Sequence, residues 1–282
     1  MILLRYGEAG AEKPGLLDEA GVIRDLSAHV PDITGATLSD ASLDTLRALD
    51  PASLPAVTGT PRLGPCVTGF GKFLCIGLNY SDHAAETGAA IPEHPILFFK
   101  ANSAIVGPND TVSMPRGSTQ TDWEVELGVV IGKTAKYVSK ADALDHVAGY
   151  CVVNDVSERH FQINLTGQWT KGKSCDTFGH TGPYLVTRDA VPEPLHLSMS
   201  HDVNGKRMQT GNTATMIFTV AEIIEHLSNL MTLEPGDVIS TGTPPGVAMG
   251  MKPEPRYLKV GDVMEVESEG LGVQRQEVAM DA

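Results

Sequence analysis

The segment at residues 121–132 constrains the fold most, because it has the pattern of a buried strand that carries two acids. Successive strand side chains point to opposite faces, so Glu124 and Glu126 lie on one face while Trp123 and Leu127 lie on the other. Two adjacent carboxylates repel each other, and burying an unpaired one is costly. The pair therefore needs a cation or a shared proton, unless the strand is an ordinary half-exposed one with its polar face in water.

A second apolar strand, predicted for residues 147–155, provides a third acid. It ends on Asp155 just before the chain turns polar, and ligands are often found where strands run into loops. Glu124, Glu126 and Asp155 would form a site that has only oxygen ligands. Such a site suits Mg²⁺ or Mn²⁺ first and Ca²⁺ next, whereas Zn²⁺ prefers histidine and cysteine.

Composition excludes several classes of protein. The 282 residues are 41% hydrophobic and 20% charged, which is ordinary for a soluble globular chain of one large domain or slightly more. The net charge of −14 disfavours nucleic acids and anionic membranes as partners. The first residues do not resemble a signal peptide, and no apolar run is long enough to span a membrane, so we expect a cytoplasmic protein. The cysteines at 66, 75, 151 and 175 lack metal or disulfide spacing and are expected to be free thiols.

The chain divides into two predicted parts. Residues 1–65 are expected to form a small N-terminal domain with a strand at 1–6, a hairpin at 15–26 and a helix at 38–49, before a proline-rich linker. Residues 66–282 form the predicted catalytic domain, in which strands greatly outnumber helices, so the fold class is mostly β (α+β). The clearest helix covers 219–230, and further strands are predicted at 73–78, 96–99, 183–187, 195–203, 237–241 and 262–267.

A short helix predicted at residues 79–86 carries a possible acid–base pair. The i, i+3 spacing places His83 and Glu86 on one face, where the carboxylate can orient the imidazole so that it activates a water. The alternative is a solvated helix face. A second helix predicted to begin after Asp155 would place Arg159 and Gln162 one turn from the acids, where Arg159 either neutralises them or binds substrate.

Two later segments add polar groups. Lys173 lies in a polar, glycine-containing loop, where a lysine either meets negative charge or only increases solubility. Thr243 lies in the turn at 239–246, which follows a strand and offers hydroxyl and backbone N–H groups to a carboxylate.

Five motifs in this order resemble the fumarylacetoacetate hydrolase family over about residues 70–270. They are NY-x-DH-x-x-E at 79–86, EVELG at 124–128, ND-x-S-x-R at 154–159, KS at 173–174 and GD-x-I-x-TGTP at 236–244. The opening LLRYG and the EKPG at 12–15 are further similar to short bacterial members labelled ureidoglycolate lyase or 2,4-diketo-3-deoxy-L-fuconate hydrolase.

The resemblance implies a rolled, mostly-β catalytic domain, a small N-terminal domain and a homodimer. It implies that the three acids bind Mg²⁺ or Mn²⁺ and that Lys173 stabilises developing negative charge. The resemblance also implies that a mobile lid carries the water-activating pair of His83 and Glu86. The positions that match substrate contacts in longer members are Arg159, Gln162 and Thr243.

The implied reaction is hydrolysis of a C–C bond in a 2,4-diketo acid of the acylpyruvate type, or of a 2,4-diketo-3-deoxy sugar acid, to pyruvate and a carboxylic acid. Oxaloacetate decarboxylation, ureidoglycolate cleavage and a metal-binding scaffold without activity stay open as alternatives. For the tail of the substrate the candidate contacts are His160, Trp169, Met216 and Phe218, each of which could equally be a core residue.

Overall fold

A computed structural model describes residues 1–281 and has the mostly-β fold that the sequence predicts. Four helices are named here: α1 (Asp40–Arg47), α2 (Ser81–Thr87), α3 (Thr170–Lys173) and α4 (Val220–Leu230). The strands are β1 (Ile2–Tyr6), β2 (Lys13–Leu17), β3 (Ile23–Asp25), β4 (Phe73–Gly77), β5 (Ile96–Lys100), β6 (Ile105–Val106), β7 (Val112–Met114), β8 (Thr121–Asp122), β9 (Val125–Ile131), β10 (Val147–Asp155), β11 (Ser157–Glu158), β12 (Gly179–Thr187), β13 (Ser198–Val203), β14 (Lys206–Asn212), β15 (Val238–Ser240), β16 (Val263–Ser268) and β17 (Gly272–Met280).

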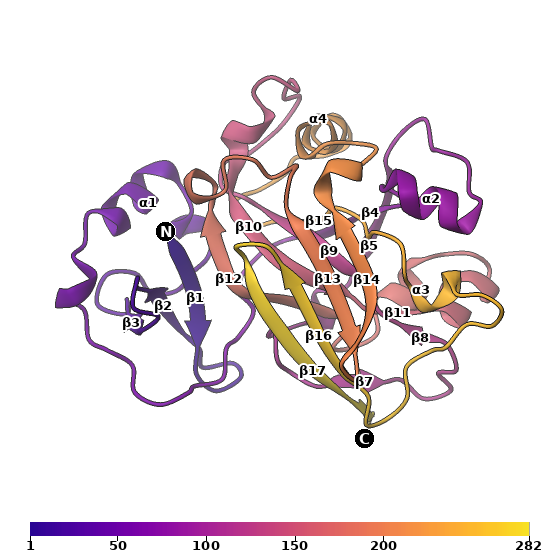
Figure 1. The fold of residues 1–282 in the computed structure, drawn as a ribbon. Coiled ribbons are helices and arrows are strands. Elements are labelled where there is room, and N and C mark those ends of the chain that lie inside the picture. Colours follow the sequence, from indigo (N-terminus) through magenta and orange to yellow (C-terminus); the bar gives the residue numbers. More distant parts are fainter. Residues whose placement is uncertain (282) are drawn as a thin grey trace.

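The larger sheet is rolled. Its strands follow the order β3-β2-β1-β12-β10-β9-β15-β4-β5, and β6, which follows β5 after one short turn, pairs with β12 (Figure 1). Because β5 and β6 are consecutive in the chain, this pairing brings the β5 end of the sheet back towards β12. Side chains on the inner face, such as those of Cys75, Phe98, Cys151 and Val153, pack in one buried cluster although their strands are far apart in the order.

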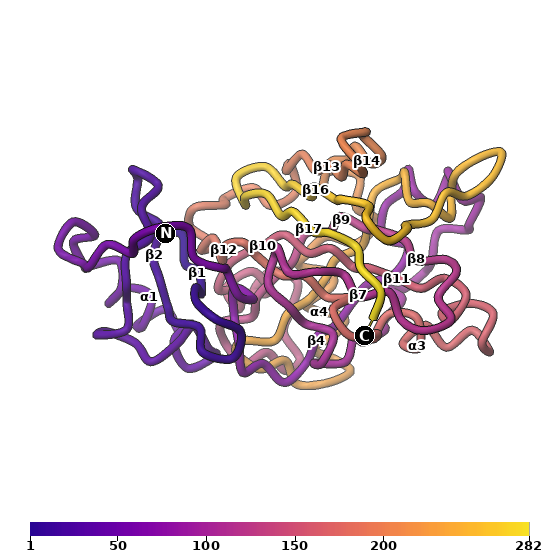
Figure 2. Tube along the Cα trace, turned by 90° about the horizontal axis from the view of Figure 1, so that it is seen from below, coloured from indigo at the N-terminus to yellow at the C-terminus, as the bar shows by residue number. Residues whose placement is uncertain are grey.

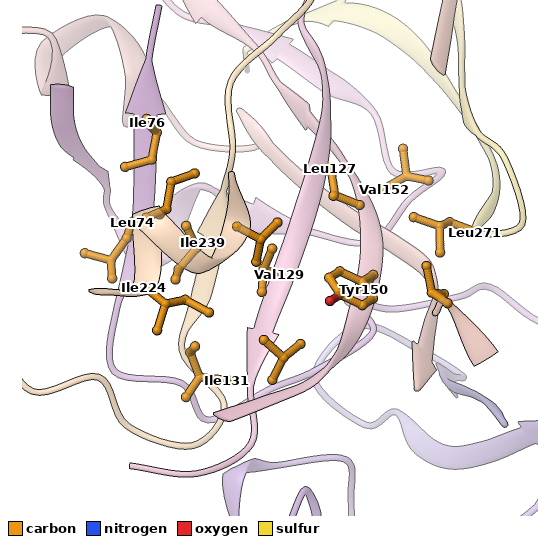
Figure 3. Packing of buried hydrophobic residues seen from close by; sticks show 14 of the residues in the cluster. Leu74, Ile76, Leu127, Val129, Ile131, Tyr150, Val152, Ile224, Ile239 and Leu271 are labelled. Atoms are coloured by element: carbon orange, nitrogen blue, oxygen red, sulfur yellow. The ribbon is translucent and has the colours of Figure 1, made fainter. Parts of the chain in front are cut away.

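The outer face of the roll is covered by a second sheet and a helix. The second sheet has the order β14-β13-β16-β17-β7, and α4 covers the neighbouring part of the same face (Figure 1). Figure 3 shows this core, in which Val129 and Ile239 meet Ile224 of α4 while Val152 lies near Leu271. The helix is fixed at its start by Thr219 and Glu222, which form a capping box.

The N-terminal strands continue the large sheet. β1 pairs with β12 and with β2, which pairs with β3 across the predicted hairpin turn. Figure 2 shows this part of the chain extending to one side of the remaining molecule. The boundary at residue 65 stays a prediction. Among residues 1–281, no cysteine forms a disulfide, and no helix combines the length and hydropathy that a membrane-crossing helix needs.

Three predictions of local structure were wrong in detail. The expected continuous strand at 121–132 is interrupted at Trp123–Glu124, because the backbone N–H of Glu124 donates to the side chain of Asn154 and not to a backbone carbonyl of β10. The segment after Asp155 begins with the short strand β11, which pairs with β8, and only then forms a π-helical turn at His160–Asn164. β14 and β17 were missed, because several of their buried positions are the glutamines Gln209, Gln274 and Gln276 and not apolar residues.

Candidate active site

The three predicted acids converge inside the roll. Val153 of β10 lies opposite Glu126 of β9, so Asp155, two residues further on, projects from the same face as Glu126. The backbone N–H of Asp155 donates to the carbonyl of Glu124 at 2.9 Å, which fixes the two strand ends together. One carboxylate oxygen from each acid lies within 4.8 Å of the other two, and all three residues are buried. The alternative of a half-exposed strand with its acids in water is therefore excluded.

Three buried cations surround the acids. Arg159 Nη2 donates to Glu124 Oε1 at 2.6 Å, and Lys173 Nζ donates to Glu124 Oε2 at 2.6 Å and to Asp155 Oδ2 at 2.7 Å. Lys100 Nζ donates to the other oxygen of Asp155 and, at 3.0 Å, to the carbonyl of Val156. Each oxygen of Glu124 and Asp155 is thus paired with a cation.

Lys173 reaches this cluster because Gly172 lets α3 approach closely. A methyl group at Gly172 would overlap the backbone of Glu158 and Gln162, so α3 packs directly against β11 and the turn that follows it. Burial lowers the pKa of Lys173, but the carboxylates of Asp155 and Glu124 raise it more, so its side chain stays an ammonium group. The lysine is buried and ion-paired, which excludes a purely solubilising role.

The two glutamates on the strand have opposite electrostatic environments. Burial alone would raise the pKa of Glu124, but Arg159 and Lys173 lower it to about 2. Burial and the nearby carboxylates of Asp155 and Glu124 raise the pKa of Glu126 well above its usual value. Glu126 Oε2 accepts hydrogen bonds from Ser240 and from the backbone of Gly242, but no cation pairs with this acid among the described residues. Glu126 is therefore the acid that most needs additional positive charge.

This donor set fits a hard divalent cation. Asp122, also buried, adds a fourth acid, so Asp122, Glu124, Glu126 and Asp155 face Lys100, Arg159 and Lys173. With all groups ionised the cluster carries one excess negative charge. Burial and the neighbouring carboxylates raise the pKa of Glu126, and a bound Mg²⁺ or Mn²⁺ would supply the positive charge that offsets both effects. The three carboxylate oxygens lie close enough together to bind one such ion.

The predicted acid–base pair forms on α2. His83 Nδ1 lies 3.1 Å from Glu86 Oε2, and the backbone N–H of Gly246 donates to both oxygens of Glu86 at 3.1 and 3.2 Å. His83 is 6% exposed and lines the cavity beside the acids, so a solvated helix face is excluded. Because Nδ1 is held by the carboxylate, Nε2 is the ring atom left to accept a proton.

The three predicted substrate contacts differ in whether they have a hydrogen-bonding group free to bind a ligand. Arg159 donates to Asp122, Glu124 and Gln162 through its three nitrogens, so neutralising and orienting the acids is one role that the structure supports directly. Because the side-chain oxygen of Gln162 accepts from Arg159, its NH₂ group is left to donate to a ligand. Thr243 Oγ1 donates to the carbonyl of Val125 and accepts from Gln209, so its proton is already used.

These groups line one cavity of about 250 Å³. Its walls include Glu124, Glu126 and His83 at the acid cluster, and the cavity volume lies below the usual range for drug-sized ligands, which starts at roughly 300 Å³. The site therefore has room for a small metabolite. Of the four candidate tail contacts, only Trp169 lines this cavity, whereas His160, Met216 and Phe218 do not.

Two functional residues were missed at the sequence level. Lys100 directly follows the predicted strand at 96–99 and is the last residue of β5, and a lysine that continues an apolar strand is a signal for a buried ion pair. Asp122 accepts from Arg159 Nε at 2.8 Å and from the backbone of Ala248 at 2.7 Å, and so anchors the arginine. Its position just before the glutamates was visible, but its partners come from distant parts of the chain.

Fold and site together define a class of protein: a rolled β-domain whose interior holds a buried cluster of three carboxylates beside a histidine–glutamate pair. The family model described as Fumarylacetoacetate (FAA) hydrolase C-terminal matches residues 72–279. The chain therefore belongs to the fumarylacetoacetate hydrolase family.

Known proteins resemble the chain over nearly its whole length. A Burkholderia lata protein that has only the general name of a hydrolase is 62% identical over 276 residues, which cover 98% of each chain. The structure of a fumarylacetoacetate hydrolase from psychrophilic Exiguobacterium antarcticum has a TM-score of 0.87 at 36% identity, with 100% of each chain covered. The structure of maleylpyruvate hydrolase from Sphingobium sp. SYK-6 in complex with manganese(II) ion and pyruvate has a TM-score of 0.82 at 28% identity, again with 100% of each chain covered.

Proposed function

We propose that this protein is a hydrolase that requires a divalent metal ion and cleaves a C–C bond in a 2,4-diketo acid of the acylpyruvate type. The observation that carries the proposal is a small cavity lined by Glu124 and Glu126 of the acid cluster together with His83 and Lys173. The manganese and pyruvate bound to the similar maleylpyruvate hydrolase support the same metal class and the same product.

The acids Glu124, Glu126 and Asp155 would hold the ion. When bound, a divalent ion supplies Lewis-acid stabilisation for the 1-carboxylate and 2-oxo oxygens of such a substrate. Mg²⁺ and Mn²⁺ are the ions that best suit an all-carboxylate set. The remaining steps are assigned to side chains of this chain.

His83 would act as the general base. Its Nε2 takes a proton from a water while Glu86 holds Nδ1 and stabilises the imidazolium that forms. The water oxygen bonds to C4 of the substrate, and the C3–C4 bond then breaks with its electron pair moving to C3 and the 2-oxo group. The products are a carboxylic acid and the enolate of pyruvate, which becomes pyruvate when C3 takes up a proton.

Lys173 would stabilise the negative charge that develops. Two of its three N–H groups donate to Glu124 and Asp155, and the third is left for an oxygen of the substrate. Because the ammonium group is fixed by two carboxylates and buried, it needs little reorganisation when charge appears nearby. The NH₂ group of Gln162 offers a second, neutral donor in the same cavity.

A product panel tests this proposal. Purified protein with Mn²⁺ should release pyruvate from an acylpyruvate, and the Glu126→Gln variant should release none. Removal of metal with a chelator should stop the reaction, and Mg²⁺ or Mn²⁺ should restore it. Release of CO₂ from oxaloacetate or of urea from ureidoglycolate, without pyruvate release from any diketo acid, would replace the proposal with the corresponding alternative.

A further inference from the structure

We infer that the site selects diketo acids whose acyl tail is apolar and uncharged, with Trp169 and Ile163 setting this preference. The inference rests on the proposed function and names its substrate class. It depends on how polar and apolar groups are divided within the cavity.

The lysine and arginine side chains of the cavity lie at the acid cluster. Among the described residues that line the cavity, the only lysine and arginine side chains are those of Lys173 and Arg159. Lys173 bonds to Glu124 and Asp155, and Arg159 bonds to Glu124 and Asp122. Both cations are therefore committed to the end that would hold the 1-carboxylate and the 2-oxo group. No further lysine or arginine is left to pair with a second carboxylate on the tail.

The lining of the cavity changes from charged to apolar at Phe98. Lys173 Nζ lies over its ring, 5.1 Å from the centroid, while the indole of Trp169 packs edge-on against the same ring with centroids 5.4 Å apart. The order from the acids outwards is thus ammonium group, phenyl ring and indole. The wall beyond the ammonium group is made largely of apolar side chains: Leu78, Ile96, Phe98, Ile163, Trp169 and Met249.

Gly77 fixes the position of the indole. A methyl group on Gly77 would overlap the ring of Trp169, so the indole lies directly against the backbone of β4. Ile96 is the strand partner of Gly77 on β5, and it contributes to the same wall. The apolar end of the cavity is therefore bounded by the indole of Trp169 where it rests on the backbone of Gly77.

Hydroxyl groups on the tail would also find few partners. Besides the acids, the cations and His83, the polar side-chain groups that line the cavity among residues 1–281 are the hydroxyls of Thr87 and Thr243, the indole N–H of Trp169 and the amide of Gln162, which lies beside Arg159 at the acid cluster. Thr87 donates to carbonyls of its own helix, and Thr243 donates to the carbonyl of Val125. A buried carboxylate or hydroxyl without a partner loses its hydration, so a charged or polyhydroxylated tail should be rejected.

The test compares tails of equal length. For the Mn²⁺-loaded protein, we expect kcat/KM for an alkyl-tailed acylpyruvate to exceed that for the same tail ending in a carboxylate by roughly 100-fold or more. A polyhydroxylated tail should be disfavoured as well. The Kd values of the matching 2-oxo acids, measured by calorimetry, should show the same preference without any turnover.

A matched pair of variants locates the preference. Ile163 lines the cavity and is 47% exposed, so an arginine at this position can fold and supply a cation at the rim. Leu165, two residues away and 42% exposed, does not line the cavity. Ile163→Arg should reduce the discrimination against the carboxylated tail at least tenfold, and Leu165→Arg should leave it unchanged. Trp169→Ala should shift the preference towards longer apolar tails.

The outcomes separate the two proposals. Absence of pyruvate release from every diketo acid would refute the proposed function, while the Kd comparison would still test the preference. Equal or tighter binding of the carboxylated acid by the wild type would overturn the inference and leave the hydrolase proposal standing. The same conclusion would follow if Ile163→Arg and Leu165→Arg changed the discrimination equally.

Discussion

Replacing Glu124 and Glu126 separately with glutamine should have opposite effects on stability, although the two acids lie on the same face of the strand. The pKa of Glu124 is lowered from 4.5 to about 2, and each unit of pKa corresponds to ~1.4 kcal/mol. Glu124→Gln should therefore lower the free energy of unfolding at pH 7 by about 3 kcal/mol. Glutamine also has only one acceptor oxygen, so either Arg159 or Lys173 would lose its partner at this residue.

The sign of the pH dependence follows from the direction of the shift. Because the folded-state pKa of Glu124 lies below the unfolded-state value, its contribution is complete above pH 4.5 and is lost as the pH falls towards 2. Glu126 behaves in the opposite way, since its raised pKa makes the ionised form costly in the folded protein as the pH rises above 4.5. Without metal, Glu126→Gln should raise the free energy of unfolding at pH 7, because the neutral glutamine removes this cost.

Metal should reverse the order of stability of wild type and Glu126→Gln. An ion at 100 times its Kd stabilises a protein that binds it only when folded by about 2.7 kcal/mol. Wild type should gain this amount from Mn²⁺, and Glu126→Gln should gain much less. The assay is urea unfolding at pH 7, with a chelator or with saturating Mn²⁺. The reasoning is refuted if both glutamine variants lose equal stability in the chelator, or if Mn²⁺ stabilises Glu126→Gln as much as wild type.

Three further predictions address other groups. His83→Ala should lower kcat for pyruvate release by roughly 10²–10⁴ without changing the urea midpoint, and an unchanged kcat would remove it as the base. Lys100→Met should cost about 3–5 kcal/mol of unfolding free energy because Asp155 loses a buried partner; a loss below 1 kcal/mol would count against that ion pair. His201 is buried without a hydrogen-bond partner among the described residues, and burial lowers its pKa to about 3. Its folded-state pKa lies below the ordinary 6.5, so the wild type should lose about 2 kcal/mol between pH 7 and pH 5 through this residue. His201→Phe should remove that loss, and equal acid sensitivity in both proteins would contradict it.

The acid cluster could be predicted from sequence because it depends on local periodicity. The alternation of Glu124, Glu126 and their apolar neighbours defines one buried strand, and Asp155 ends the next apolar segment. Neighbouring strands in the chain often pair, so the meeting of the three acids followed from elementary topology.

The cations around the cluster could only partly be predicted. Lys100 meets Asp155 across the interior of the roll, because β6 pairs with β12 and curls the sheet. No local pattern encodes that pairing. Lys173 was located through family resemblance, but its burial depends on the close approach that Gly172 allows between α3 and β11. The division of the cavity between charge and apolar surface likewise depends on Phe98 and Trp169 meeting from separate segments.

The central claim is that Glu124, Glu126 and Asp155 bind one divalent cation. Anomalous diffraction from crystals soaked in Mn²⁺ tests it most directly. We predict one strong peak within bonding distance of a carboxylate oxygen from each of the three acids, and no peak there in the Glu126→Gln variant. A peak bound elsewhere, or none at Mn²⁺ concentrations that support pyruvate release, would contradict the account.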